Sequence, residues 1–185
     1  MDLYERLSHI DEGTYGIVWK AKEISTGKLV ALKQCKFPED QQASSAGFPM
    51  AVLREINILL ALSHPNILPV REMVQGSSPS KVFMVMDYMR CDLKKAVTDL
   101  PEVMSQGEAK GVTQQLCSAV SFMHSKGFFH RDLKTANILV HESGKVCICD
   151  FGLARRFDEP LRGDYTQMVV TLWYRPPELL MGATT

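Results

Sequence analysis

Three different polar chemistries lie within eight residues of this sequence, in the stretch from His130 to Asn137. Asp132 carries a carboxylate that can accept a proton from a substrate hydroxyl, and the ammonium group of Lys134 can offset negative charge on a transferred phosphoryl group. Asn137 offers a neutral oxygen to a hard cation such as magnesium. The stretch therefore predicts a site for magnesium and phosphate chemistry.

A second acidic stretch follows a short apolar run. Asp150, Phe151 and Gly152 come directly after the apolar residues 146–149, and the carboxylate of Asp150 adds the stronger oxygen ligand that one asparagine lacks. Taken alone, an Asp-Phe-Gly triplet is more often a solvated turn between two strands. Its place 18 residues after Asp132 favours a shared magnesium and phosphate site instead.

The neighbouring sequence predicts the elements that hold these residues. Apolar runs at residues 128–129 and 138–140 predict two short strands that pin the polar loop at both ends. Ser105 and Glu108 fit a capping box, and apolar residues at three- and four-residue steps predict a helix over residues 105–124. This helix would serve as the scaffold that delivers the loop.

The two stretches resemble the H-R-D-L-x-x-x-N catalytic loop and the D-F-G motif of eukaryotic protein kinases. The resemblance implies an α+β fold with two lobes. The first would be a β-sheet lobe with one helix over residues 1–88, and the second would be part of a helical lobe over residues 89–185. The implied reaction is transfer of the γ-phosphoryl group of ATP, with Mg²⁺, to a serine or threonine hydroxyl in proteins.

The resemblance also assigns roles within the two stretches. Asp132 would orient and deprotonate the hydroxyl, and Lys134 would stabilise the transferred group. Asn137 and Asp150 would hold magnesium. Lys134 favours serine and threonine over tyrosine as substrates by analogy with the family, and proline-directed kinases share the stretch 169–175, so the expected substrates carry Ser/Thr-Pro.

Near the start of the chain, residues 3–10 and 17–23 predict two strands joined by a turn with two glycines, Gly13 and Gly16. Glycines in such a turn let backbone N–H groups approach phosphates, because no side chain holds the main chain away. Glycine turns are usually only turns, so this pattern gains its meaning from the later motifs.

The third predicted strand, residues 29–33, is apolar until Lys33. A lysine that ends such a run needs an anionic partner, since a desolvated ammonium group is costly. The alternative is an exposed lysine at a strand end. The resemblance implies that Lys33 holds the α- and β-phosphates of ATP and pairs with Glu55. The sequence has no G-x-x-x-x-G-K-[ST] motif, which disfavours a P-loop NTPase.

Apolar residues at three- and four-residue steps predict a helix over residues 49–62, with Pro49 in its first turn. Its start resembles the P-S-T-A-I-R-E type helix of cyclin-dependent kinases, and the ending Leu53-Arg54-Glu55 is most like the PITSLRE branch. A cyclin partner that binds through Pro49–Glu55 is therefore implied.

The resemblance implies further contacts with the nucleotide. Backbone groups of Asp87 and Met89 would bind adenine behind Met86, and Asp92 would reach the ribose. The full set of implied nucleotide contacts is Ile10, Asp11, Glu12, Gly13, Thr14, Tyr15, Gly16, Val18, Ala31, Lys33, Met86, Asp87, Met89, Asp92 and Leu139. Without the resemblance, the methionines of the strands predicted at 67–74 and 81–88 would be core residues.

The polar stretch after Asp150 is too long for an ordinary connection, which indicates a functional loop. It resembles the activation segment of cyclin-dependent kinases. Thr166 would be the activating phosphorylation site, and Thr14 and Tyr15 would be inhibitory ones. The arginines implied to bind phosphorylated Thr166 by charge-assisted hydrogen bonds are Arg54, Arg131 and Arg155.

The composition of the chain disfavours nucleic-acid-binding, membrane and secreted proteins. The chain has 185 residues, is 45% hydrophobic, and carries 21 basic and 21 acidic residues, so no strong field attracts nucleic acid or membranes. Neither a signal peptide nor a membrane span is evident. Five cysteines, sparse and odd in number, suit reduced thiols inside the cell. A nuclear rather than cytoplasmic location rests on family analogy alone.

The end of the sequence raises an alternative function. Pro176 replaces the alanine of the family's A-P-E motif, and the family domain continues with further helices, so a chain of this extent is expected to be marginally stable. The alternative is therefore an inactive fragment or regulator that binds only nucleotide or cyclin. The kinase hypothesis requires Lys33, Asp132, Asn137 and Asp150 to serve one triphosphate and its divalent ion.

Asp11 departs from the family's glycine pattern, G-x-G-x-x-G-x-V, because it stands where the first glycine is expected. It adds a Cβ atom and a negative charge near the expected phosphates, so we predict weakened rather than abolished binding of ATP. Replacing Asp11 with glycine should raise nucleotide affinity, as measured by calorimetry. Unchanged affinity in Asp11→Gly would contradict this prediction.

Overall fold

The computed structural model describes residues 3–13, 16–35, 50–78, 81–99, 104–157 and 171–182, and at 11–13, 16, 50, 51 and 54 it describes the backbone alone. The chain divides into two compact units. The first contains residues 1–63 and 68–89, and the second contains residues 64–67 and 90–185. The sequence placed a boundary after residue 88 and did not foresee that residues 64–67 belong to the second unit.

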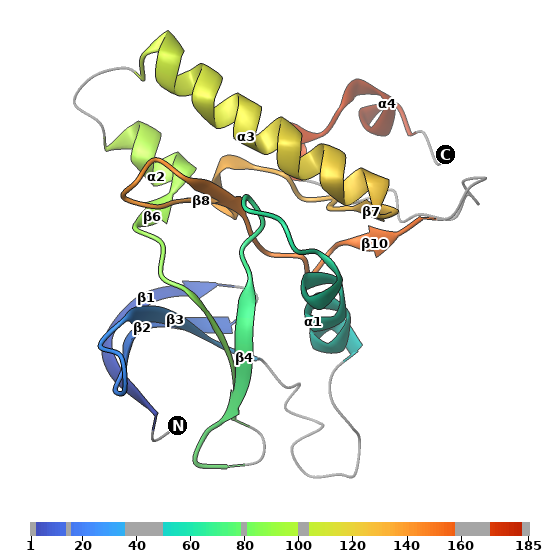
Figure 1. Cartoon of the computed structure of the whole chain (residues 1–185). Helices are drawn as coiled ribbons and strands as arrows, with labels where there is room; N and C mark the ends of the chain where they lie inside the picture. The colour runs from blue at the N-terminus through green and yellow to red at the C-terminus, as the bar shows by residue number, and fades with distance from the viewer. Residues whose placement is uncertain are drawn as a thin grey trace. The chain divides into compact units, whose positions relative to one another are not determined.

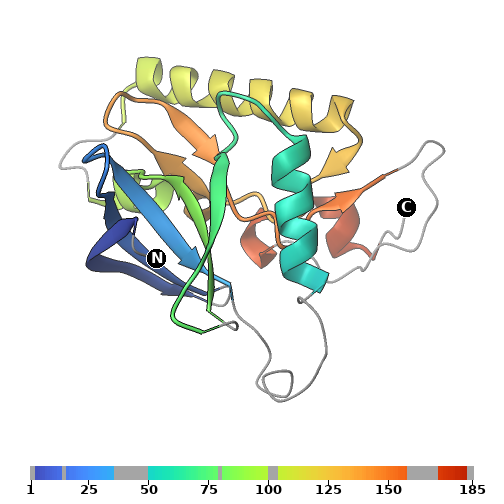
Figure 2. The same cartoon turned by 60° about the horizontal axis from the view of Figure 1, so that its bottom comes forward.

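The described residues of the first unit form five strands and one helix (Figure 1). In chain order they are β1 (Tyr4–Gly13), β2 (Gly16–Glu23), β3 (Leu29–Gln34), α1 (Met50–Ala61), β4 (Val70–Gln75) and β5 (Val82–Asp87). The strands form an antiparallel sheet in the order β1-β2-β3-β5-β4. Figures 1 and 2 show α1 beside β4, and the two elements are in contact.

A hydrophobic core lies on one face of this sheet. Its buried members come from four of the five strands and are Tyr4, Ala21, Val30, Leu32, Phe83 and Val85. The hydroxyl of Tyr4 on β1 donates a hydrogen bond to Glu72 on β4, which joins the two outermost strands of the sheet. Burial and the Glu72 carboxylate raise the pKa of Tyr4 to about 12, so its hydroxyl stays a donor. The sheet is therefore strongly curled.

The second unit is built around α3 (Gln106–Ser125), which packs against β7 (Phe128–Phe129) and β9 (Val146–Ile148). Its other elements are β6 (Cys91–Asp92), α2 (Leu93–Thr98), η2 (Thr135–Asn137), β8 (Ile138–Val140), β10 (Arg155–Arg156), η3 (Leu172–Tyr174) and α4 (Pro177–Leu180). Strands β6, β8 and β9 form one sheet, and β7 pairs with β10 in another.

Several local expectations are confirmed. The capping box at the start of α3 is present, with the Ser105 side chain accepting from the Glu108 N–H and the Glu108 carboxylate accepting from the Ser105 N–H. The predicted helix over 49–62 appears as α1, and the strands predicted on both sides of the polar loop appear as β7 and β8. The strand predicted from residue 67 begins only at Val70, because Ile67 pairs with Ile148 of the second unit instead.

A buried asparagine ties residues 64–67 to the second unit. The Asn66 side-chain nitrogen donates to the Gln115 oxygen of α3 and to the Val146 carbonyl of β9, both at 2.8 Å. The Asn66 carbonyl accepts from the Ile148 N–H at 2.9 Å. The segment that follows α1 is thus fixed by hydrogen bonds to two other elements of this unit.

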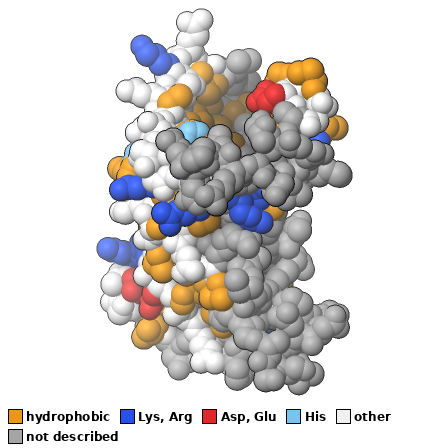
Figure 3. Space-filling model, turned by 90° about the vertical axis from the view of Figure 1, so that its right-hand side faces the viewer, with side chains coloured by type: hydrophobic (Ala, Val, Ile, Leu, Met, Phe, Trp, Pro, Cys, Tyr) orange, Lys and Arg blue, Asp and Glu red, His pale blue; other side chains and the backbone are white. Residues whose placement is uncertain are grey.

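Charged and apolar side chains both reach the surface, as the face shown in Figure 3 illustrates. In the second unit Leu172, Trp173 and Met181 are 60, 90 and 81% exposed. None of the described helices is long and apolar enough to cross a membrane.

We expect Asn66→Ala to lower the free energy of unfolding by about 1–3 kcal/mol, because it removes a donor from the buried Val146 carbonyl of β9 and one of the two donors to the part-buried Gln115 oxygen of α3. Urea unfolding of the variant and the parent protein measures this difference. Ser118→Ala is the matched control, since it removes a hydrogen-bonding partner of His64 at an exposed position. Equal effects of the two substitutions would contradict a special role for Asn66.

Candidate active site

The loop 130–137 of the second unit begins with a backbone conformation that favours glycine. Arg131 has φ = 67°, and Asp150 at the start of the second stretch has φ = 64°. Non-glycine residues in this left-handed region are strained and persist only when their surroundings hold them. The Arg131 Nε donates to the Leu153 carbonyl at 2.8 Å, so the two strained segments support each other.

His130 provides a second connection between these segments. It is 1% exposed, and its Nδ1 accepts from the Asp132 N–H at 3.2 Å. Its Nε2, which then carries the proton, lies 3.0 Å from the Cys149 carbonyl and donates to it. Burial lowers the pKa of His130, which keeps the ring neutral and this pattern of donor and acceptor fixed.

The Asp132 carboxylate lies at the centre of the site and is only 4% exposed as a residue. Its Oδ2 accepts from the Lys134 Nζ at 2.8 Å and from the Asn137 Nδ2 at 3.0 Å. Its Oδ1 accepts from the Thr171 hydroxyl at 3.0 Å and from the Thr171 N–H at 3.3 Å. Both oxygens are therefore held by donors from three positions in the chain.

These donors decide the charge of Asp132. Burial by itself raises the pKa of the carboxyl, but hydrogen bonds from Lys134, Thr171 and Asn137 and the positive charge of Lys134 outweigh it. The pKa of Asp132 consequently lies below its ordinary value, and the group is ionised at neutral pH.

Asp132 also orients the side chain of Asn137. Its Nδ2 donates to the Asp132 carbonyl at 2.8 Å as well as to the carboxylate, so its oxygen points away from Asp132. The Asn137 carbonyl accepts from the Cys149 N–H at 3.0 Å, which brings Asp150 next to it in space. One amide oxygen and one carboxylate are hard oxygen donors, which suits Mg²⁺ because that ion keeps several of its own waters.

The first unit contains a buried ion pair. Lys33 on β3 and Glu55 on α1 lie 2.6 Å apart, Nζ to Oε1, and are 9 and 6% exposed. A buried charge without its partner costs about 3–5 kcal/mol, so this pair fixes α1 against the sheet. Burial, together with the nearby Glu55, raises the pKa of the neighbouring Cys35 to about 11, which keeps that thiol protonated.

The other implied nucleotide contacts fall in both units. In the first unit, Val18 lies opposite Lys33 and Ala31 lies opposite Met86 in the register of the sheet. Ala31, Met86 and Met89 are buried, Ile10 is 46% exposed, and Asp87 makes an ion pair with Arg71 at 2.7 Å. In the second unit, Leu139 lies on β8, and Asp92 accepts from the Lys95 N–H at 2.8 Å as the N-cap of α2.

Some of the predicted site residues lie outside what the structure describes. They are Thr14, Tyr15 and Thr166, together with the side chains of Asp11, Glu12 and Arg54. Gly13 and Gly16 are described as the last residue of β1 and the first of β2. Of the other two implied arginines, Arg131 has been described above, and Arg155 lies on β10 with its guanidinium donating to the Ala154 carbonyl at 2.9 Å.

Comparison with known proteins decides the family. Residues 4–185 match the protein kinase domain. The chain belongs to the protein kinase domain family. It is 49% identical over 182 residues to cyclin-dependent kinase G-2 of Oryza sativa subsp. indica, covering 98% of this chain and 25% of the relative.

Two animal relatives support the same branch of the kinase family. Cyclin-dependent kinase 11B of Homo sapiens is 45% identical over 180 residues, which is 97% of this chain and 22% of the relative. The serine/threonine-protein kinase PITSLRE of Drosophila melanogaster is 46% identical over 181 residues, 96% and 18% of the two chains. The resemblance to the PITSLRE branch is thus confirmed, and the chain spans a quarter or less of the length of these relatives.

The structure connects one residue, Thr171, to the loop 130–137 that sequence reasoning did not connect to it. Asp132, Asn137 and Asp150 lie in the second unit, whereas Lys33 and Glu55 lie in the first. Thr171 was missed as a site residue, although it contacts both Asp132 and Lys134. It lies 39 residues beyond Asp132, and no spacing rule links a threonine at that distance to the carboxylate. His130 was recognised only as part of a motif.

Thr171→Val should raise the pKa of Asp132 toward its ordinary value, because the hydroxyl donor is lost while the shape of the side chain is kept. Titration of the Asp132 carboxyl carbon by NMR measures the shift. A group with a lowered pKa stabilises the fold above its unfolded pKa and loses this contribution as pH falls through the folded pKa. In Thr171→Val the loss should therefore be smaller in total and be complete at a higher pH.

Thr113→Val is the matched control for this prediction. Thr113 lies at an exposed position of α3, where its hydroxyl donates to the Ala109 carbonyl at 2.8 Å, far along the chain from the loop. It should leave the Asp132 titration unchanged. An unaltered or lower Asp132 pKa in Thr171→Val would show that this hydroxyl does not stabilise the carboxylate.

Proposed function

We propose that this chain is the catalytic part of a serine/threonine protein kinase of cyclin-dependent type. The reaction is transfer of the γ-phosphoryl group of Mg-ATP to a serine or threonine hydroxyl in proteins. The observation that carries the proposal is the Asp132 carboxylate, which is buried, ionised, and held by Lys134, Asn137 and Thr171. The names of the relatives support the same class.

The geometry suits positioning of a hydroxyl more than strong base catalysis. Phosphoryl transfer passes through a loose transition state, so placing the attacking oxygen and stabilising charge supply most of the rate enhancement. A carboxylate of lowered pKa is a weak base, but its oxygens are fixed in direction by Thr171 and Lys134. In the proposed reaction Asp132 accepts the hydroxyl proton as the hydroxyl oxygen bonds to the γ-phosphorus and the bond from that phosphorus to the leaving ADP breaks. Lys134 offsets charge on the transferred group.

Two sets of residues would bind the Mg-ATP. The oxygen of Asn137 and the carboxylate of Asp150 would hold magnesium, which neutralises charge on the phosphates when it is bound. Lys33, aligned by Glu55, would hold the α- and β-phosphates. That both units serve one nucleotide is taken from the family resemblance, as are the adenine contacts of Asp87 and Met89.

The family resemblance also supports a proposal for how the kinase is regulated. A cyclin would bind the region Pro49–Glu55, which continues into α1, and the buried Lys33–Glu55 pair would couple the position of this helix to the phosphates. Phosphorylated Thr166 would bind Arg54, Arg131 and Arg155, and phosphorylation of Thr14 and Tyr15 would oppose the ATP phosphates by charge. The proposed substrates carry Ser/Thr-Pro, and the proposed location is the nucleus or cytoplasm.

Asp132→Asn in the full-length protein with its cyclin should lower the turnover number by about 10²–10⁴-fold and leave ATP affinity within a small factor of the parent. Phosphotransfer to a protein substrate and calorimetric binding of ATP measure the two effects. Asp99→Asn is the control, because Asp99 is an exposed carboxylate in the second unit outside the loop.

Retained turnover in Asp132→Asn would refute the assigned role of this residue. If the parent protein binds nucleotide or cyclin but transfers no phosphoryl group, the alternative of a binding-only regulator is correct.

A further inference from the structure

Two hydroxyl groups connect the loop 130–137 to the segment that begins at Thr171. The side-chain oxygens of Thr135 on η2 and Tyr174 on η3 lie 2.8 Å apart and form a hydrogen bond in which either group can donate. The two residues are 39 positions apart in the chain. The proposed reaction assigns no role to either of them, so their contact needs an explanation of its own.

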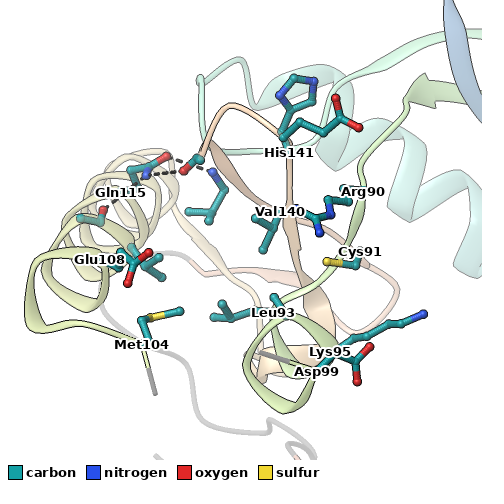
Figure 4. A pocket seen from close by; sticks show the side chains of 16 residues that line it. Arg90, Cys91, Leu93, Lys95, Asp99, Met104, Glu108, Gln115, Val140 and His141 are labelled. Atoms are coloured by element: carbon teal, nitrogen blue, oxygen red, sulfur yellow. Dashed lines mark hydrogen bonds between the residues drawn. The ribbon is translucent and has the colours of Figure 1, made fainter. Parts of the chain in front are cut away.

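Thr135 lies on a firmly packed part of the second unit. Its carbonyl accepts from the Ile138 N–H at the end of η2, and β8 continues directly from there. Ile138 is buried in a cluster with Leu93 of α2 and Val146 of β9, and Val140 packs against this cluster. Figure 4 shows Leu93 and Val140 lining the same cavity between α2, α3 and β8. Burial of these apolar side chains therefore fixes η2 in place.

The segment 171–182 is held differently. The structure describes all of its residues, and none of them is buried, including those of η3 and α4. Two of its side chains bond to the loop: Thr171 to Asp132 and Lys134, and Tyr174 to Thr135. Polar contacts, rather than apolar packing, therefore hold this segment against the loop.

The turn of η3 links Tyr174 to Thr171. The Tyr174 N–H donates to the Thr171 carbonyl at 2.8 Å, so holding Tyr174 at Thr135 also holds Thr171. The Thr171 hydroxyl accepts from the Lys134 Nζ at 3.2 Å and donates to the Asp132 Oδ1 at 3.0 Å, and the Thr171 N–H donates to the same Oδ1 at 3.3 Å. A displaced Thr171 would thus deprive this carboxylate oxygen of two donors at once.

We propose that Thr135 and Tyr174 are positioning residues for phosphoryl transfer. Their bond holds Thr171 against Asp132 and so keeps the carboxylate in the direction in which it accepts the substrate proton. Neither residue touches the reacting atoms, but alignment supplies much of the rate in such a reaction, and a small misplacement is costly. The kinetic consequence rests on the proposed function, whereas the hold on Thr171 can be measured without turnover.

Hydrogen exchange tests the hold on Thr171. Thr135→Val removes one hydroxyl, keeps the shape of the side chain and leaves the sequence of residues 171–175 unchanged. Peptides that contain residues 171–175 should exchange about 2–10-fold faster in this variant, the factor expected for one neutral hydrogen bond. Mass spectrometry of the full-length protein with its cyclin measures the rates. Thr98→Val is the matched control, because the Thr98 hydroxyl donates to the Lys94 carbonyl at an exposed position on α2, and it should leave these peptides unchanged.

Kinetics test the positioning role. Tyr174→Phe and Thr135→Val should each lower the turnover number with a protein substrate by about 2–10-fold. The double variant should lose no more than either single one, since both changes remove the same bond. The KM for ATP and the stoichiometry of ATP binding by calorimetry should keep their parental values, which separates misplacement from a loss of folded protein. Thr135→Ser keeps a hydroxyl and should behave like the parent in both turnover and exchange.

The inference is overturned if residues 171–175 exchange alike in Thr135→Val and the parent, or if the second substitution lowers turnover as much in the variant as in the parent. Faster exchange with full turnover would show a contact that has no role in positioning, and also overturns it. A parent protein that transfers no phosphoryl group would refute the proposed function instead, and the exchange comparison would still decide whether the two hydroxyls hold Thr171.

Discussion

A buried carboxylate that is held in its ionised form determines much of the second unit. Removing a carboxylate from water is costly unless hydrogen bonds and opposite charge replace the lost hydration. Asp132 receives these from Lys134 and Asn137, at the two ends of η2, and from Thr171, 39 residues along the chain. The positions of η2 and of the residues beyond 170 are therefore linked to a single side chain.

The backbone near this carboxylate is strained at two residues, and hydrogen bonds from His130 and Arg131 hold it in that conformation. Arg131 and Asp150 both have left-handed φ angles without being glycine. His130 bonds to the Asp132 N–H and the Cys149 carbonyl, and Arg131 bonds to the Leu153 carbonyl. The bonds to the Cys149 and Leu153 carbonyls join the first stretch to the second, so neither segment can relax alone. Such mutual support is how a site keeps donors aimed before a ligand arrives.

The sequence predicted those features that depend on neighbouring residues. Ser105 and Glu108 indicated the start of α3 because a capping box is a local arrangement, and the apolar steps of α1 were equally local. The six-residue helix α2 was missed, since it is too short to show a period. Family motifs, rather than physics, linked Lys33 to Glu55, because nothing in a spacing of 22 residues indicates an ion pair.

The features that could not be predicted are long-range contacts between polar groups. Asn66 bonds to Val146, 80 residues later, and Thr171 bonds to Asp132, 39 residues earlier. A lone asparagine or threonine carries no pattern that identifies its partner, and the partner is fixed only when hydrophobic packing has placed the strands. Only the folded structure shows their partners, and in this kinase domain they hold both residues 64–67 and the loop 130–137.

The second unit uses charge in two opposite ways, and the difference bears on what each place can bind. Around Asp132 the charges are paired and buried, so they are fixed in direction before a ligand arrives, which is what stabilisation of a transition state requires. On the surface of this unit, Arg90, Lys95, Asp99 and Glu142 are exposed and make no ion pairs among the described residues. Exposed charges keep their water and contribute little affinity each.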